Sequence, residues 1–516
     1  MWSIRPLLVL PVLAAVAGGA YDVVKRTRQG YVGGNKLRVL GVEVEEFRGI
    51  PFAQPPVGPL RFLPPRPASP WEGTLNATSR KTACPQDLIT GALKDVIEFT
   101  EDCLHLNVWT PVSGEQDTPV LVWIYGGGFK YGSASYDLYT GAVMAGNTGL
   151  VVVSVNYRLG ALGFLNAYSP LSPGNMGLLD QNLALMWVQE NIHEFGGDRS
   201  RRAVMMSGNL LTRLYLDSVP ESIIKGVALA SALGCGSDNK TLISHPKEVI
   251  ECLRSKSAED ILLATSETLS ARELRFLPTF GDRFLPMEPK VAAVNGLFDP
   301  VDLLVGVTED EGAIALMLPL RKELMSDNLG HLGGRALQRS LHTAFSPWLE
   351  NGPQGMLSEY TSHARDGPSL RRQYVDYISD SVFVCPMHFA AERHSKRGQS
   401  IYSYVFGHRP TVNLFGQREQ PLPSWMRTPH SYDLIYLFGA PLVDQETFDA
   451  EDAAVSSMLL RILGTFATTG VPELPGNQQW PKYSAECPIS AYLNGGNVTD
   501  LVYFRTQHCD AWRRYL

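Results

Sequence analysis

The stretch PVLVWIYGGGF, residues 119–129, is the clearest structural signal in the chain. Its continuous apolar run predicts a buried strand, and the glycines that follow predict a turn. A second apolar run, LVVVSVNYRLG at 150–160, predicts another buried strand, and apolar positions at helical spacing in 177–194 predict a helix. Buried strands that alternate with helices indicate an α/β fold around a largely buried central sheet.

The rest of the chain continues this alternation without an internal repeat or a low-complexity linker. The Pro-rich stretch 51–70 is expected to form ordered turns and loops. The remaining elements are predicted as strands at 203–206, 225–233, 301–307 and 400–407, and as helices at 210–216 and at 452–470, closed by Gly470. Residues 21–516 are therefore expected to form a single large domain.

The composition is that of a globular protein and excludes one class of partner. Of the 516 residues, 44% are hydrophobic and 19% are charged, which is enough apolar material for a large core. The formal net charge is −7, and no run of five or more Lys or Arg residues occurs. Nucleic acid is therefore not an expected partner. No cofactor and no metal site are predicted.

The first twenty residues, MWSIRPLLVLPVLAAVAGGA, predict export from the cell. One cation, Arg5, precedes an apolar run, and Ala15-Val16-Ala17 forms a cleavage site of small residues, as in a secretory signal peptide. The alternative is a membrane anchor, but the run is shorter than the roughly 20 residues that a spanning helix needs. No later segment is long and apolar enough to span a membrane, so a secreted, extracellular protein is expected.

The cysteines and the glycosylation sequons are consistent with an extracellular protein. Seven cysteines, at 84, 103, 235, 252, 385, 487 and 509, are expected to pair for the most part, leaving at least one over because seven is odd. Asn-x-Ser/Thr sequons are candidate glycosylation sites at Asn76, Asn239 and Asn497.

Several stretches together resemble the type-B carboxylesterase/cholinesterase family. They are FRGIPFAQPPVGPLRF (47–62), EDCLHLNVW (101–109), VWIYGGGF (122–129), NYRLGALGFL (156–165), GNMGLLDQNLALMWVQENIHEFGGD (174–198) and HSYDLIYLFGAPL (430–442). The resemblance runs from about residue 22 to the end of the sequence. It implies the α/β-hydrolase fold, with a central, mostly parallel sheet flanked by helices. It also implies disulfides Cys84–Cys103, Cys235–Cys252 and Cys385–Cys509, with Cys487 left over.

The resemblance supplies an acid, a base and part of an oxyanion hole. Ester hydrolysis on this fold needs a serine nucleophile, a histidine base, an acid and backbone N–H donors. Glu311, in TEDEG after a predicted strand, matches the acid, and His430, in TPHSYDLIYLFG, matches the base. Arg427 stands where the family usually has Gly and is expected to crowd the histidine loop.

The oxyanion donors are assigned to Gly126 and Gly127, with Gly128 beside them, and to Gly208, although a run of glycines is also simply a permissive turn. Tyr125 replaces the histidine that usually precedes these glycines, a change that leaves backbone donors intact.

The nucleophile is the exception, because no serine lies in a Gly-x-Ser-x-Gly pattern. Ser207 in AVMMSGNLL (203–211) comes nearest, but Met205 and Asn209 occupy the glycine positions of a tight strand-to-helix turn. Counting from Asp198 places Gly208 at the nucleophile position, whereas counting back from VPES (219–222) selects Ser207. One residue is thus missing ahead of this turn, and a one-residue slip in a strand reverses the direction of its side chains.

Ester hydrolysis is therefore predicted to be weak or absent. The alternatives are a functional carboxylic ester hydrolase that uses Ser207, and a non-catalytic homologue that binds a ligand or a protein partner. A misread segment at 199–218 is a further explanation. Between Cys84 and Cys103 no Trp occurs and Phe99 is the only aromatic residue, so this loop does not predict recognition of a quaternary ammonium. A small-molecule ester or another apolar ligand is expected instead.

Overall fold

The computed structural model describes residues 21–86, 98–112, 117–198, 202–209, 211–267, 276–317, 322–329, 334–349, 355–412, 421–495 and 497–515. The predicted signal peptide and residues 87–97 of the first cysteine loop lie outside these ranges. The chain divides into two compact units, Met1–Ser200 with Tyr215–Pro286 and Arg201–Leu214 with Met287–Leu516.

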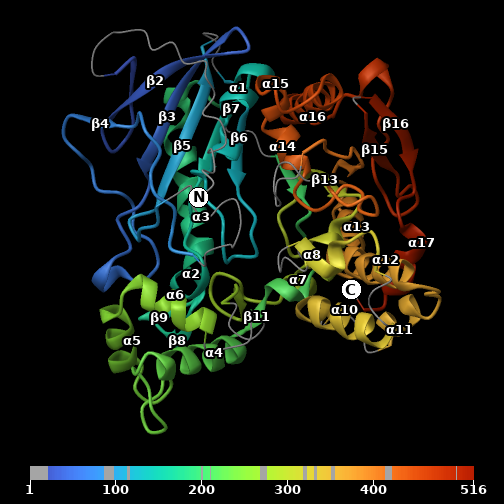
Figure 1. Ribbon diagram of the computed structural model, residues 1–516. Helices are drawn as coiled ribbons and strands as arrows, with labels where there is room; N and C mark the ends of the chain where they lie inside the picture. Colours follow the sequence, from blue (N-terminus) through green and yellow to red (C-terminus); the bar gives the residue numbers. More distant parts are fainter. Residues whose placement is uncertain are drawn as a thin grey trace, which may run out of the picture. The chain divides into compact units, whose positions relative to one another are not determined.

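A seven-stranded sheet forms the centre of the first unit, in the order β1-β2-β3-β5-β7-β6 with β4 paired to β2 (Figure 1). Most neighbouring strands are antiparallel, but two pairs are parallel: β2 with β4, and β6 with β7, where Val120 lies opposite Val151. The strands are β1 (Val23–Arg26), β2 (Tyr31–Val39), β3 (Val42–Pro51), β4 (Thr74–Asn76), β5 (His105–Pro111), β6 (Val120–Ile124) and β7 (Val151–Val155). Two small ladders join β8 (Asn166–Ser169) to β9 (Ser172–Pro173) and β11 (Asp217–Ser218) to β12 (Thr279–Phe280).

Apolar helix faces cover this sheet. Helix α1 packs against β3 and β5, and Trp187 of α3 belongs to the same buried core cluster as Val108 of β5 and Val153 of β7. The helices of this unit are α1 (Ala142–Thr148), α2 (Gly160–Phe164), α3 (Met176–Asn191), α4 (Val219–Ala232), α5 (Pro246–Ser255) and α6 (Ala258–Glu267), with short 3-10 turns η1 (Gly58–Leu60), η2 (Asp137–Tyr139) and η3 (Ile192–Phe195).

The second unit has a five-stranded sheet in the order β10-β13-β14-β15-β16. The first four strands are parallel and β16 is antiparallel to β15. They are β10 (Arg202–Met206), β13 (Asp302–Thr308), β14 (Ile401–Phe406), β15 (Ser490–Asn494) and β16 (Asn497–Val502). Among the described residues of this unit, β10 pairs with β13 and is the first strand in the order, whereas β14 is buried along its whole length.

Helices α12 and α13 of the second unit flank the part of the chain that carries the candidate acid. They are joined by a π-helical segment, η6 (Ser379–Val384), and α13 packs against β13 and β14 (Figure 1). The helices are α7 (Pro289–Val294), α8 (Ile314–Met317), α9 (Lys322–Met325), α10 (Gly334–Leu349), α11 (Met356–Thr361), α12 (Gly367–Ile378), α13 (Cys385–Ser395), α14 (Asp433–Leu437), α15 (Ala440–Val443), α16 (Ala450–Thr469) and α17 (Thr506–Trp512), with 3-10 turns η5 (Glu311–Ala313) and η7 (Pro475–Asn477).

The α/β class is confirmed, with mixed sheets that are largely antiparallel in the first unit and largely parallel in the second. The three disulfides implied by the family resemblance are present as Cys84–Cys103, Cys235–Cys252 and Cys385–Cys509, and Cys487 is free. Of the helices in the described ranges, none is long and apolar enough to cross a membrane.

Two predicted elements are wrong. Residues 225–233, predicted as a strand, lie mostly in helix α4, because Ser218 and Glu221 form a capping box that starts a helix ahead of the apolar run. The helix predicted at 210–216 is replaced by a single 3-10 turn, η4 (Arg213–Tyr215). Here the side chain of Asn209 binds the N–H groups of Leu211 and Thr212, which favours a turn over a continuous helix.

Candidate active site

Glu311 lies in a tightly held loop directly after β13. Its side chain is fully buried, and Oε1 accepts a hydrogen bond of 2.7 Å from the backbone N–H of Thr308. The next residue, Gly312, donates its N–H to Ser379 Oγ at 2.9 Å. A Cβ atom on Gly312 would lie 2.0 Å from the carbonyl oxygen of Val375, so only glycine fits. Helix α12 and η6 therefore fix the position of the acid.

The loop that carries His430 is bonded to the loop of the acid. Asp310 donates its N–H to the carbonyl of Thr428 at 2.9 Å, and Thr428 Oγ1 donates to the carbonyl of His408 at 2.9 Å. His430 Nδ1 lies 2.5 Å from Glu311 Oε2, and the ring of Phe383 packs 5.0 Å from the imidazole. The structure thus brings the predicted acid and base together.

Electrostatics in this pair favour the protonated imidazole. Burial disfavours the charged ring, but the charge and hydrogen bond of Glu311, with nearby Asp433, raise the pKa of His430 above its usual value. Burial and the charge of Glu311 also raise the pKa of Asp433 to about 7. With Nδ1 bound to the carboxylate, the other ring nitrogen, Nε2, is the one left to accept a proton, and the His430 side chain is 21% exposed.

Ser207 is hydrogen-bonded to the acid, and no hydrogen bond to the base is found among the described residues. It directly follows β10, has a left-handed φ of 52°, and donates its N–H to the carbonyl of Gly306 at 2.8 Å. Its hydroxyl donates to Glu311 Oε1 at 2.5 Å. Within the described ranges no hydrogen bond joins Ser207 to the ring of His430. The three residues are close together, but the serine hydroxyl is directed at the carboxylate.

Asn209 has a structural role that the sequence did not suggest. Its Oδ1 accepts hydrogen bonds from Leu211 N and Thr212 N, each at 2.9 Å, and its Nδ2 donates to the carbonyl of Val382 at 3.1 Å. This amide attaches the segment after Ser207 to η6. Gly208 is exposed, and a Cβ atom there would lie 3.7 Å from the nearest atom, so its local space does not require glycine.

The glycine loop after β6 belongs to the first unit and has available donors. Gly127 and Gly128 have positive φ angles of 132° and 59°, and a Cβ on Gly127 would lie 1.9 Å from the carbonyl oxygen of Tyr131. Among the described residues, none accepts a hydrogen bond from the N–H groups of Gly126, Gly127 or Gly128. The loop is therefore a constrained turn with unused N–H groups, which is what oxyanion binding needs.

Tyr125, which replaces the usual histidine, stacks on Tyr157 with ring centroids 4.5 Å apart, and each hydroxyl donates to the other residue's carbonyl. Arg427 does not crowd the histidine loop: its side chain is 54% exposed and forms an ion pair of 3.1 Å with Glu309. Both substitutions are thus accommodated without displacing a candidate site residue.

The structure describes the side chains of two of the three predicted glycosylation sites. Asn76 and Asn239 are exposed, while the side chain of Asn497 lies outside the described part of the structure. In the described part, no group of three or more His, Cys, Asp or Glu side chains is arranged to hold a metal ion. Sequence reasoning missed Asp310 and Arg372, and it treated Asn209 only as a residue in a glycine position. Only Asp310, adjacent to Glu311 in TEDEG, carried a local signal.

The fold and the acid–histidine pair define the class of α/β hydrolases. A sequence model described as "Carboxylesterase family" matches residues 22–201 and 199–512. The chain is 33% identical over 559 aligned residues to acetylcholinesterase from Bungarus fasciatus, an alignment that covers 100% of this chain and 90% of the relative. The protein belongs to the carboxylesterase family. The two matched segments meet at residues 199–201, immediately ahead of β10 and Ser207.

Proposed function

We propose that this protein is a secreted carboxylesterase-like protein whose ester hydrolysis is weak or absent, because Ser207 does not serve as an efficient nucleophile. The observation that supports this most directly is the 2.5 Å hydrogen bond from Ser207 Oγ to Glu311 Oε1. The site keeps an acid and a base, so binding of a small-molecule ester or another apolar ligand remains its expected use.

The chemistry explains why this bond matters. A serine attacks a carbonyl only as its proton passes to a neighbouring base, which in this fold is the histidine. A hydroxyl proton directed at Glu311 leaves Nε2 of His430 without its donor and competes for the carboxylate that orients the ring. Loss of a nucleophile leaves about 10³–10⁴-fold acceleration over water in an otherwise intact site, which an ordinary assay does not detect.

The division of the family match at residues 199–201 also supports this proposal. It coincides with the missing residue ahead of β10, the first strand of the sheet in the second unit, where β10 pairs with β13. A shift of one residue there would turn side chains to the opposite face of the sheet. The local irregularity is thus confined to the segment that delivers Ser207.

The alternative is a working hydrolase that uses Ser207. One observation favours it: Ser207 has a left-handed φ of 52° at the carboxyl end of a parallel strand, the kind of strained turn that exposes a nucleophile in this fold. Rotation of its side chain away from Glu311 would then be needed to reach His430.

A fluorophosphonate, which bonds covalently to an activated serine, separates the two functions. We would treat the secreted protein, map the labelled peptides by mass, and treat the Ser207→Ala variant in parallel as a control. The proposal predicts no label on Ser207. A label on Ser207 that disappears in His430→Gln would establish the hydrolase instead. The same spectra would read residues 199–218 directly and reveal any misread segment.

Secretion, glycosylation and substrate class are part of the proposal. They are supported by the apolar leader at residues 1–20, the three disulfides and the exposed Asn76 and Asn239. The absence of Trp between Cys84 and Cys103 argues against choline esters, although the relative is an acetylcholinesterase. Sequencing the N-terminus of protein collected from the medium, before and after glycosidase treatment, tests the first two points. A protein partner is a separate possibility that co-purification from the medium would reveal.

A further inference from the structure

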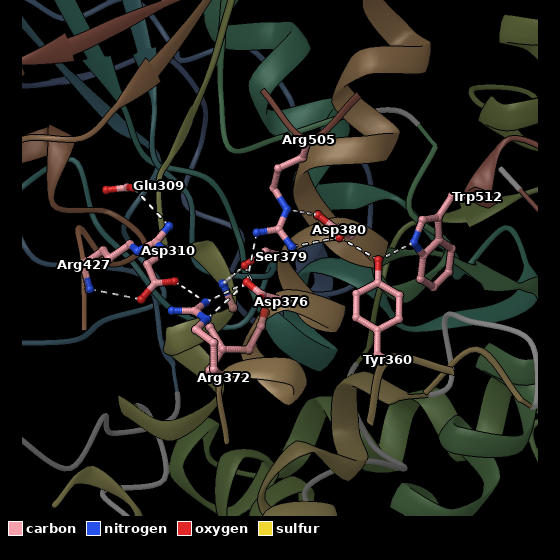
Figure 2. Close-up of polar contacts among 12 residues, drawn as sticks. Glu309, Asp310, Tyr360, Arg372, Asp376, Ser379, Asp380, Arg427, Arg505 and Trp512 are labelled. Carbon is pink, nitrogen blue, oxygen red and sulfur yellow. Dashed lines mark hydrogen bonds and ion pairs between the residues drawn. The ribbon is translucent and has the colours of Figure 1, made fainter. Parts of the chain in front are cut away.

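A chain of ion pairs in the second unit runs from the loop of the acid to the last described helix (Figure 2). Arg372, on α12, binds Asp310 and lies 3.0 Å from Asp376 on the same helix. Asp376 lies 2.9 Å from Arg505, which in turn binds Asp380 in η6. Arg372 is thus held between Asp310 of the acid loop and Asp376 of α12. Asp376 is in turn held by Arg505.

The far end of this chain is also fixed. Tyr360 donates its hydroxyl to Asp380 Oδ2 at 2.6 Å, and Trp512 Nε1 donates to the Tyr360 oxygen at 3.0 Å (Figure 2). The disulfide Cys385–Cys509 ties α13 to α17 beside these residues. The position of Arg372 therefore depends on packed elements and not on one surface contact.

Asp310 is the point where three elements meet. One carboxylate oxygen accepts from Arg372, and the other accepts the backbone N–H of Arg427 at 3.1 Å. The backbone N–H of Asp310 donates to Thr428, two residues before His430. The residue is fully buried and directly precedes Glu311. Asp310 therefore joins the acid loop, the histidine loop and helix α12.

Removal of the arginine would leave a buried carboxylate without a cation. Burial acts against the charge of Arg372, but the charges and hydrogen bonds of Asp310 and Asp376 raise its pKa, as expected for a strongly paired guanidinium. An unpaired Asp310 would either take up a proton or turn toward water, and both changes would weaken its hold on residues 427–430.

We propose that Asp310 and Arg372 are positioning residues that hold the His430 loop against Glu311. The inference rests on the proposed function only in taking Glu311 and His430 as the acid and base of the site. It does not depend on whether Ser207 reacts. Neither Asp310 nor Arg372 is required to touch a substrate, since each acts through the geometry of the Glu311–His430 pair.

The titration of His430 is the readout that tests this role. In the intact protein, NMR would follow the imidazole signals of the 11 histidines against pH, with His430 identified by its absence in His430→Gln. In Arg372→Met the loops separate, burial remains and the contact with Glu311 weakens, so we expect the pKa of His430 to fall by about one unit or more. Arg372→Lys, which keeps the charge but not the fork of donors, should restore part of the shift.

A matched control removes a comparable ion pair from the same unit. Arg513 binds Glu392 with both guanidinium ends, at 2.7 and 2.9 Å, and among the described residues it forms no hydrogen bond or ion pair with either loop. Arg513→Met should leave the titration of His430 unchanged. A pKa of His430 that stays constant in Arg372→Met, or rises because Asp310 keeps an uncompensated charge, would overturn the proposal.

If Arg372→Met does not fold, Asp310→Asn provides the second test. The amide still accepts the N–H of Arg427 but no longer attracts Arg372, so a smaller fall in the pKa of His430 is expected, and no fall would refute the role. Failure of the proposed function is seen separately, because it would appear as fluorophosphonate label on Ser207 of the unaltered protein.

Discussion

The loops of Glu311 and His430 and the segment that carries Ser207 are held in contrasting ways. The acid and histidine loops are joined by a backbone hydrogen bond from Asp310 to Thr428, and the buried carboxylate of Asp310 binds Arg372 of α12. Within the second unit, the Ser207 segment follows β10 and is attached to η6 through the side chains of Asn209 and Thr212, which both donate to the carbonyl of Val382. The loops of Glu311 and His430 are therefore held by ion pairs, hydrogen bonds and packing together. The Ser207 segment is held by fewer contacts within the second unit.

Because of this difference, a well-formed Glu311–His430 pair does not by itself indicate that the protein hydrolyses esters. The Glu311–His430 contact of 2.5 Å is maintained by groups that also complete the core of the second unit, such as Gly312 against Val375. Such a pair persists for reasons of stability even where the nucleophile is lost. In the Ser207 segment, the contacts to η6 are made by Asn209 and Thr212, so we expect changes at Ser207 itself to act mainly on chemistry.

The largest expected effect is a gain in esterase activity when the Ser207 segment is repaired. We would insert one residue ahead of β10 and introduce Met205→Gly and Asn209→Gly, which restores the Gly-x-Ser-x-Gly pattern in register. Because triad members act as a unit, kcat/KM for simple esters should rise about 10³-fold or more.

The same repaired protein with Ser207→Ala is the control and should show no gain. An unchanged rate in the repaired protein, with His430 still titrating as before, would mean that the remainder of the site is not competent.

Disturbing the packing of the Glu311 loop against α12 should strongly lower the stability of the protein. In Gly312→Ala the new Cβ would lie 2.0 Å from the Val375 carbonyl oxygen, so α12 or the acid loop must shift. We expect the free energy of unfolding to fall by about 3 kcal/mol. Gly334→Ala is the matched control, because no atom lies within 4 Å of a Cβ there. Equal urea midpoints for the two variants would show that the acid loop is not rigidly packed.

The free energy of unfolding should depend on pH through Asp433, which lies near Glu311 and His430. Its pKa is raised to about 7, so between about pH 4 and 7 the folded protein holds a proton that the unfolded chain has lost, and stability falls as pH rises through this window. The raised pKa of His430 acts in the same direction, since its contribution is present below its unfolded pKa and lost above its folded one.

Asp433→Asn should therefore lose less stability than the unaltered protein between pH 5 and pH 8, by about 1 kcal/mol or more. Thermal denaturation at the two pH values measures this difference. Parallel pH profiles for the two proteins would exclude Asp433 as the source.

The smallest effect is expected in the weakly held segment. Asn209→Ala removes the acceptor for Leu211 and Thr212 and the donor to Val382, and should lower the free energy of unfolding by about 1 kcal/mol. Amide exchange at Leu211 and Thr212 should accelerate more than exchange in β13. Uniform acceleration across the second unit would show that this segment is part of the rigid region after all.

Much of the fold was predictable because it depends on local patterns. The apolar runs at 119–129, 150–160 and 301–307 became strands, and the family resemblance gave the disulfide pairing. The run at 225–233 was misassigned because short apolar runs do not distinguish a strand from a buried helix. The capping signal at Ser218 and Glu221 would have resolved it.

The candidate site was predictable only where a motif marked it. Glu311 and His430 were found and lie together, and Ser207 was recognised as doubtful, but its bond to Glu311 could not be read from the sequence. Arg372 binds Asp310 across 62 residues, and Arg505 binds Asp380 across 125, with no periodic pattern linking them. Such contacts follow from the packing of distant elements and carry no local signature.

The disulfide between Cys385 and Cys509 spans 124 residues, and this has a consequence for biosynthesis. Residues 505–512 leave the ribosome after every strand of the second unit, so Asp376 and Asp380 remain without Arg505 until translation has passed that point. The second unit can complete its core only after residues 505–512 have been made, whereas the first unit contains both of its disulfides by residue 252. The first unit should therefore fold before the second, which would be exposed longest to chaperones.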